Sequence, residues 1–208
     1  MARCPLCAER SAKRFCPAKG EEICPVCCGT HREVTIDCPT SCVHLKAGQS
    51  YESERKPIDH ALLTRVQGFG TPFVQQYGHI LAAVGQAVTE ERRTSNWLVD
   101  ADVAEVYKAL GATLKTLASG IYYESLPDGA IRQSLFRRLK SMLDSLMESS
   151  DSRKALRISE VLSILDFLAL TVALNSSGRP KSRQYLDWIA AASGAASPAT
   201  EPSRLIIP

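Results

Sequence analysis

All eight cysteines of this 208-residue chain lie between Cys4 and Cys42, and the rest of the chain contains none. The chain starts without the apolar segment and small-residue cleavage site of a secretory signal, so we expect no export and a cytoplasmic protein. Thiols stay reduced inside cells, where clustered cysteines usually bind metal rather than form disulfides. The cysteine distribution therefore predicts a metal-binding unit confined to the first part of the chain.

Two cysteine pairs have the spacing of a four-cysteine metal site. Cys4 and Cys7 form one C-x2-C pair, Cys24 and Cys27 form the other, and 16 residues separate the pairs. Each tight turn directs two sulfurs to one point, and the gap lets the two turns meet around a tetrahedral zinc ion. A C-x3-C pairing, in which Cys28 replaces Cys27, fits the spacing as well. The choice between these two cysteines stays open at this stage.

The remaining cysteines can bind a second ion that interleaves with the first. Cys38 and Cys42 form a C-x3-C pair, and Cys16 can supply a third sulfur. The fourth ligand stays open between Cys28, His31 and His44, since a neutral imidazole also binds zinc. We therefore expect about two zinc ions, with ligands drawn from nine residues: Cys4, Cys7, Cys16, Cys24, Cys27, Cys28, Cys38, Cys42 and His31.

The order of these ligands resembles that of the MYND, HIT and B-box group of cross-brace zinc fingers. The shared pattern is a C-x2-C pair, a single cysteine about nine residues later, a second close pair, and then a closing pair, and it covers residues 4–42. Lys19 stands where MYND and HIT fingers have a further ligand, and the closing pair is two cysteines rather than His and Cys. The resemblance implies a cross-brace fold whose grooves and loops bind peptide partners.

We expect the zinc sites to be structural rather than catalytic. A catalytic zinc keeps one position open for water, whereas the thiolates here are numerous enough to close both sites. The C-x2-C-x2-C run of ferredoxin-type iron–sulfur proteins is absent from the sequence. Metal binding of this kind contributes about 10–16 kcal/mol, so residues 1–45 should be unfolded without the ion.

Residues 58–192 predict an all-α bundle of five or six antiparallel helices, because apolar residues recur there at spacings of three and four. Gly68 and Gly70 separate a short helix from a longer one that we expect Thr71 to cap. Residues 158–174 are apolar almost all round and should form the central helix, in which Asp166 either pairs with an arginine or marks the one exposed position. We interpret residues 46–57 as a linker and residues 193–208 as a flexible tail.

Charge, motifs and apolar length narrow the classes of function. Residues 1–50 contain seven Lys and Arg against five Asp and Glu, and zinc-bound thiolates bring that segment close to neutral. Nucleic-acid binding through Arg10, Lys13 and Arg14 is therefore the second choice, and Phe15 is the one aromatic residue available there for base stacking. Standard catalytic motifs are absent from the sequence, so an enzyme is the third choice. The apolar stretch of 14 residues at 161–174 is short for a membrane span.

The sequence thus predicts a small zinc-stabilised cross-brace finger followed by a helical bundle. As its function we expect zinc-dependent protein interaction or scaffolding, with a protein as the partner.

Overall fold

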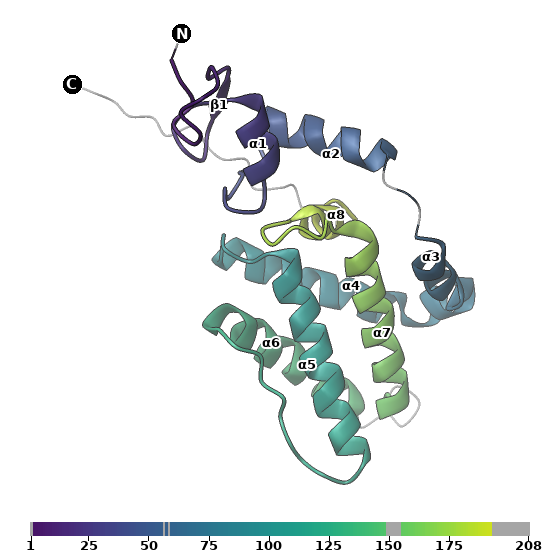
Figure 1. The fold of residues 1–208 in the computed structure, drawn as a ribbon. Coiled ribbons are helices and arrows are strands. Elements are labelled where there is room, and N and C mark those ends of the chain that lie inside the picture. Colours follow the sequence, from purple (N-terminus) through teal and green to yellow (C-terminus); the bar gives the residue numbers. More distant parts are fainter. Residues whose placement is uncertain (1, 56, 58, 149–154, 193–208) are drawn as a thin grey trace, which may run out of the picture.

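A computed structural model describes residues 2–55, 57, 59–148 and 155–192 (Figure 1). The cysteine-rich part, drawn in purple, lies at one end of the molecule, and the helices of the later part of the chain pack together below it. We call residues 2–42 the finger. The tail expected at residues 193–208 lies outside the described residues.

The finger contains a short antiparallel hairpin followed by a helix. β1 (Arg14–Cys16) pairs with β2 (Glu21–Ile23). The turn between them ends at Gly20, whose φ of +69° only glycine adopts at little cost. α1 (Pro25–His31) follows directly, and α2 (Val43–Arg55) begins one residue after the last cysteine. The hairpin was not predicted, and α2 occupies most of the segment predicted to be a linker.

Six helices make up the later part of the chain: α3 (His60–Gln67), α4 (Gly70–Thr94), α5 (Asp100–Ala118), α6 (Ala130–Met147), α7 (Ile158–Asn175) and α8 (Gln184–Ala192). The described residues therefore contain eight helices, where five or six were predicted. The difference comes from α1 and α2, which lie before residue 58. Thr71 does not cap α4, because that helix already begins at Gly70.

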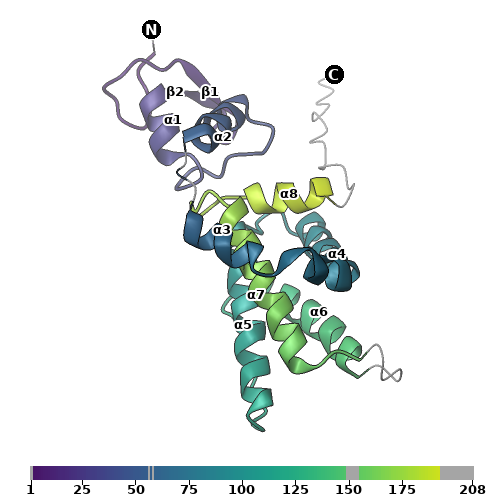
Figure 2. The ribbon, with the colours of Figure 1, turned by 90° about the vertical axis from the view of Figure 1, so that its right-hand side faces the viewer.

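α5 and α7 form the centre of the bundle. α5 contacts both α6 and α7, and α7 also contacts α3, α4 and α8 (Figures 1 and 2). The core includes large side chains that are at most 2% exposed, among them Tyr107 of α5 and Tyr185 of α8, whose hydroxyl groups lie 3.2 Å apart. The many neighbours of α7 explain why it is apolar on nearly every face.

Length and composition alone would let α7 cross a membrane, a property it shares with buried helices of globular proteins. In this structure seven of its residues are buried against neighbouring helices. Asp166 lies on its exposed side, where its carboxylate is 3.3 Å from the guanidinium of Arg65 on α3. The prediction that Asp166 pairs with an arginine is therefore confirmed, whereas the alternative that it marks the one exposed position of this helix is wrong, because Ser159, Ser163 and Ala173 are exposed as well.

Asp100 ties the start of α5 to the start of α8. Its carboxylate is 1% exposed and accepts hydrogen bonds from the Ser182 hydroxyl at 2.6 Å and from the amides of Tyr185 and Leu186 at 3.2 Å each. Amides in the first turn of a helix have no partner within the helix, so a buried carboxylate that accepts from them stabilises α8. The Asp100 amide in turn donates to the carbonyl of Ser182 at 2.9 Å.

We predict that Asp100→Ala lowers the free energy of unfolding by about 2 kcal/mol, because three buried donors lose a charged acceptor. Asp166→Ala, which removes an exposed ion pair, should change it by less than about 0.5 kcal/mol. Urea denaturation of both variants measures the two values. Equal losses would contradict the role given to Asp100.

Candidate metal centre

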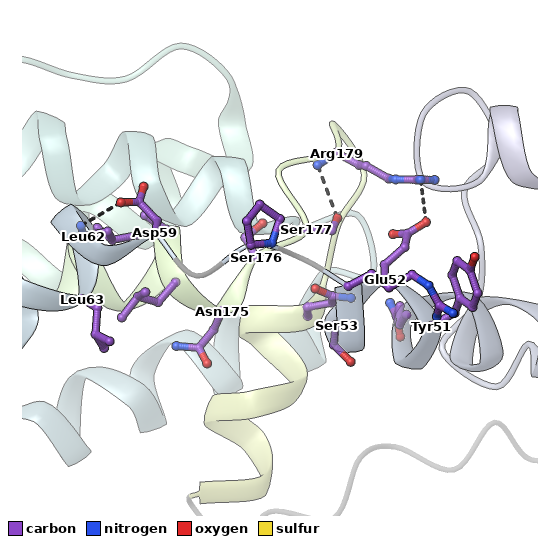
Figure 3. A pocket seen from close by; sticks show the side chains of 16 residues that line it. Tyr51, Glu52, Ser53, Asp59, Leu62, Leu63, Asn175, Ser176, Ser177 and Arg179 are labelled. Atoms are coloured by element: carbon purple, nitrogen blue, oxygen red, sulfur yellow. Dashed lines mark hydrogen bonds and ion pairs between the residues drawn. The ribbon is translucent and has the colours of Figure 1, made fainter.

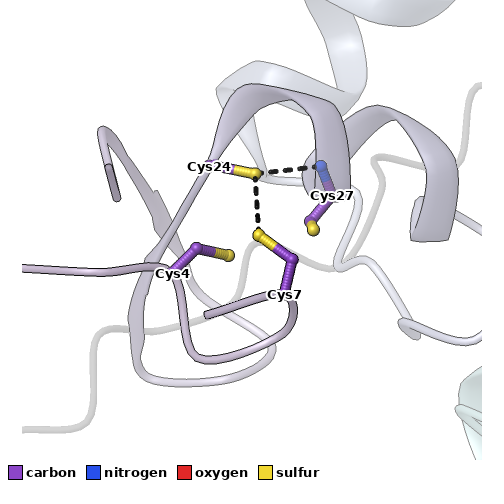
Figure 4. Close-up of side chains that lie close together, drawn as sticks. All are labelled: Cys4, Cys7, Cys24 and Cys27. Carbon is purple, nitrogen blue, oxygen red and sulfur yellow. Dashed lines mark hydrogen bonds between the residues drawn. The ribbon is translucent and has the colours of Figure 1, made fainter. Parts of the chain in front are cut away.

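Four thiols from two turns converge on one point in the finger. The sulfur atoms of Cys4, Cys7, Cys24 and Cys27 all lie within 4.8 Å of one another, and those of Cys7 and Cys24 are 4.0 Å apart (Figure 4). A tetrahedral zinc ion with Zn–S bonds of about 2.3 Å holds its sulfurs about 3.8 Å apart. The four thiols therefore fit a single tetrahedral ion.

Backbone hydrogen bonds shape the first of these turns. The amide of Ala8 donates to the carbonyl of Cys4 at 2.7 Å, and the amide of Cys4 donates to the carbonyl of Arg10 at 2.8 Å. Ala8 has a φ of +56°, which turns the chain back on itself after the second thiol. Cys4 and Cys7 are thus held on the same side of a closed loop.

The start of α1 positions the other two thiols. Cys24 is the N-cap residue, and its sulfur accepts a hydrogen bond from the Cys27 amide at 3.3 Å. Pro25 occupies the first helical position, where its missing N–H removes no helical hydrogen bond and its fixed φ suits the helix. One helical turn then brings Cys27 back beside Cys24.

Burial and hydrogen bonding shift the pKa values of two of these thiols in opposite directions. Burial raises the pKa of Cys4, but hydrogen bonds from the backbone of Cys24, Leu6 and Cys7 outweigh it and lower that pKa to about 6. Burial, followed by hydrogen bonds with the neighbouring thiols, raises the pKa of Cys27 to about 12. A metal ion that binds here near neutral pH must therefore displace a proton from Cys27, while Cys4 is already a thiolate.

The structure separates the two cysteines that spacing alone left undecided. Cys27 joins Cys4, Cys7 and Cys24, whereas Cys28 does not belong to that group. Consecutive side chains of a helix diverge by about 100°, so the two sulfurs face different neighbours. Cys28 is nevertheless buried, at 9% exposure.

The other predicted ligands do not form an equally tight group. Cys16 and Cys42 are buried, and Cys38 lies near enough to both for their charges to help burial raise its pKa. Among the described residues, however, only the four-thiol group meets the mutual 4.8 Å separation. His31 places Nδ1 2.8 Å from the Thr35 hydroxyl. Metal binding by Cys16, Cys28, Cys38, Cys42 and His31 stays a prediction.

A separate cleft of about 770 Å³ lies between α2, α3 and the end of α7 (Figure 3). Leu62, Leu63 and Leu174 provide apolar walls. The two carboxylates among its described lining residues are both engaged: Glu52 pairs with Arg179, and Asp59 accepts a hydrogen bond from the Leu62 amide at 2.9 Å.

Comparison with known proteins gives no match, whether with family models, curated proteins or solved structures. The interpretation of the site therefore depends on its own geometry and chemistry.

We predict that the metal affinity of the four-thiol site falls as pH falls, and that it falls more steeply below about pH 6. Above that pH Cys4 is already ionised, whereas below it the ion must also displace the Cys4 proton. Competition with a chelator between about pH 5 and 8 measures the slope. A constant slope through pH 6 would show that Cys4 carries no depressed pKa.

Proposed function

We propose that the protein is a zinc-dependent protein-interaction module, in which the finger binds the partner and the bundle serves as its scaffold. The observation that carries the zinc assignment is the group of four buried or half-buried thiols, spaced for one tetrahedral ion. Four sulfur ligands suit zinc and leave no position for a reacting water. The ion therefore acts by folding the finger.

A second zinc ion, bound by Cys16, Cys28, Cys38 and Cys42, completes this proposal. Cys16, Cys28 and Cys42 are each buried at 8–9% exposure, and Cys38 and Cys42 are joined by a short turn. The placement of Cys27 in the first group favours Cys28 over His31 as the fourth ligand. Both ions require thiolates, which agrees with the reducing cytoplasm as the compartment we propose.

The surface around the thiols supports a protein partner. Leu6 and Val26 occupy equivalent positions in the two turns, one residue before Cys7 and Cys27, and are 36% and 52% exposed. Phe15 on β1 is 58% exposed. Apolar side chains held outward by a metal site present a rigid surface, which another protein can cover at little entropic cost.

Nucleic acid is the less favoured partner. Arg10 lies 3.8 Å from Glu9 in an exposed ion pair, and β2 contributes Glu21 and Glu22 to the same hairpin as Arg14, the one basic residue of β1. A phosphate-binding surface requires unopposed positive charge. The mixed charges of the hairpin fit a protein surface better.

We predict that purified protein contains two zinc ions per chain and that Cys38→Ser/Cys42→Ser removes one of them while the other remains. Elemental analysis and native mass spectrometry measure the stoichiometry. Ser41→Ala, between the two cysteines, is the matched control and should keep both ions. Protein without metal, or with iron and visible absorption, would contradict the zinc assignment.

We predict further that Leu6→Asp/Val26→Asp abolishes partner binding and leaves the zinc content unchanged, because both side chains are exposed and neither belongs to the group of thiols. Proteins captured by the variant are compared with those captured by the unaltered chain. Val74→Asp, at a 45% exposed position of α4, is the control, because it also replaces one exposed apolar side chain with a carboxylate. Capture of the same proteins by all three chains would place the interaction elsewhere.

A further inference from the structure

The loop between α7 and α8 runs along the finger and bonds to it repeatedly (Figures 1 and 2). Three basic residues of this loop, Arg179, Lys181 and Arg183, make these contacts, and we call them the latch. The partners of the latch within the finger lie in the segment that connects Cys28 to Cys38: Gly29, Arg32, Glu33, Thr35 and Asp37. The finger and the bundle are thus joined through one short stretch of each.

Arg179 holds the carboxyl end of α1. Its Nη1 donates to the carbonyl of Arg32 at 2.8 Å and to that of Gly29 at 3.4 Å. Carbonyls at the end of a helix have no partner within the helix and carry partial negative charge, so a guanidinium there is favourable. Nη2 of the same side chain donates to Glu52 of α2 at 2.9 Å (Figure 3).

Lys181 and Arg183 hold the segment that follows. The amide of Lys181 donates to the carbonyl of Glu33 at 2.8 Å, and its ammonium donates to the carbonyl of Thr35 at 2.9 Å. Arg183 pairs with both carboxylate oxygens of Asp37. Because Arg183 also donates to the carbonyls of Asn96 and Leu98, it fastens Asp37 to the bundle.

α2 supports the same junction from the other side. The guanidinium of Arg32 donates to the His44 carbonyl and pairs with Glu52, which therefore bridges Arg32 and Arg179. Gly48 makes this approach possible, since a Cβ there would lie 1.5 Å from Nη1 of Arg32. Glu33, 2% exposed, accepts from Gln49 at 3.2 Å.

α1 connects the latch to the metal centre. Cys24 and Cys27 are at its amino end, and the carbonyls held by Arg179 are at its carboxyl end, only about two turns away. A seven-residue helix is too short to be stable by itself in water. If α1 unwound, its terminal carbonyls would no longer face the guanidinium of Arg179.

We infer that metal binding at the four thiols and closure of the latch are coupled through α1. Loss of the ion opens loop 176–183 and reshapes the cleft, since Arg179 of the latch and its partner Glu52 both line the cleft. The inference rests on the proposed zinc binding and adds a regulatory role to it. The cleft then keeps its present shape only while zinc is bound to the finger.

Coupling of this kind is reciprocal, which makes it measurable from either end. Arg179→Ala/Arg183→Ala should weaken zinc binding by a factor of about 5 to 150 with an unchanged number of ions. Competition with a chelator gives the affinity. In the unaltered chain, removal of zinc should speed hydrogen exchange at the Lys181 amide, whose acceptor is in the finger.

Arg65→Ala is the matched control, because it removes the exposed ion pair between Arg65 and Asp166 within the bundle. This variant should leave the zinc affinity unchanged. If the double variant does not fold, Asp37→Asn breaks the same latch from the finger side and should also weaken zinc binding. Equal affinities for the latch variants and the unaltered chain, or an unchanged Lys181 exchange rate, would overturn the coupling. A chain that binds no zinc would refute the proposed function itself, which the stoichiometry shows separately.

Discussion

The convergence of four thiols on one centre is the contact on which the finger depends. Apart from its cysteines, the finger buries only three apolar side chains: Ala12, Ile23 and Ile36. Ordering some forty residues costs far more conformational entropy than these few side chains offset by leaving water. The two strands have three residues each and form a single ladder, which is marginal without support. If the four thiols bind zinc as we propose, the sulfur–metal bonds would supply most of the stability of the finger.

The bundle, in contrast, is stabilised by the burial of apolar side chains. α5 and α7 bury apolar side chains against one another and against the remaining helices, and the polar groups inside, such as Asp100 and the Tyr107–Tyr185 pair, have partners. Burial in this core raises the pKa of both tyrosines, because it disfavours the phenolate. The cysteine-rich finger and a bundle stabilised by burial thus meet at a polar junction, where hydrogen bonds to backbone carbonyls fix their relative placement.

The sequence predicts those features that depend on local spacing. The C-x2-C pairs predicted the four-thiol group, and apolar periodicity predicted the helices after residue 60. The hairpin was missed because strands of three residues are too short to show alternation. α2 was missed because its residues are mostly polar and its place is set by tertiary contacts, among them Arg32 against Gly48. The basic run around Arg179 was a visible signal, yet nothing in its spacing could show that its partners lie almost 150 residues earlier.

The latch bonds to a segment that lies between the two sets of cysteines in the chain, so it affects the position of both sets. Residues 29–37 begin in α1, directly after Cys28, and end directly before Cys38. The latch therefore fixes the segment that joins these two cysteines. Lys181 and Arg183 hold Glu33 and Asp37, on either side of Ile36, which is buried in the same cluster as Cys16, Cys28 and Cys38. If residues 29–37 moved, the distance between Cys28 and Cys38 would change, because this segment joins the two cysteines. The bundle therefore helps to position Cys28 and Cys38 through the chain between them, a constraint that the finger alone lacks.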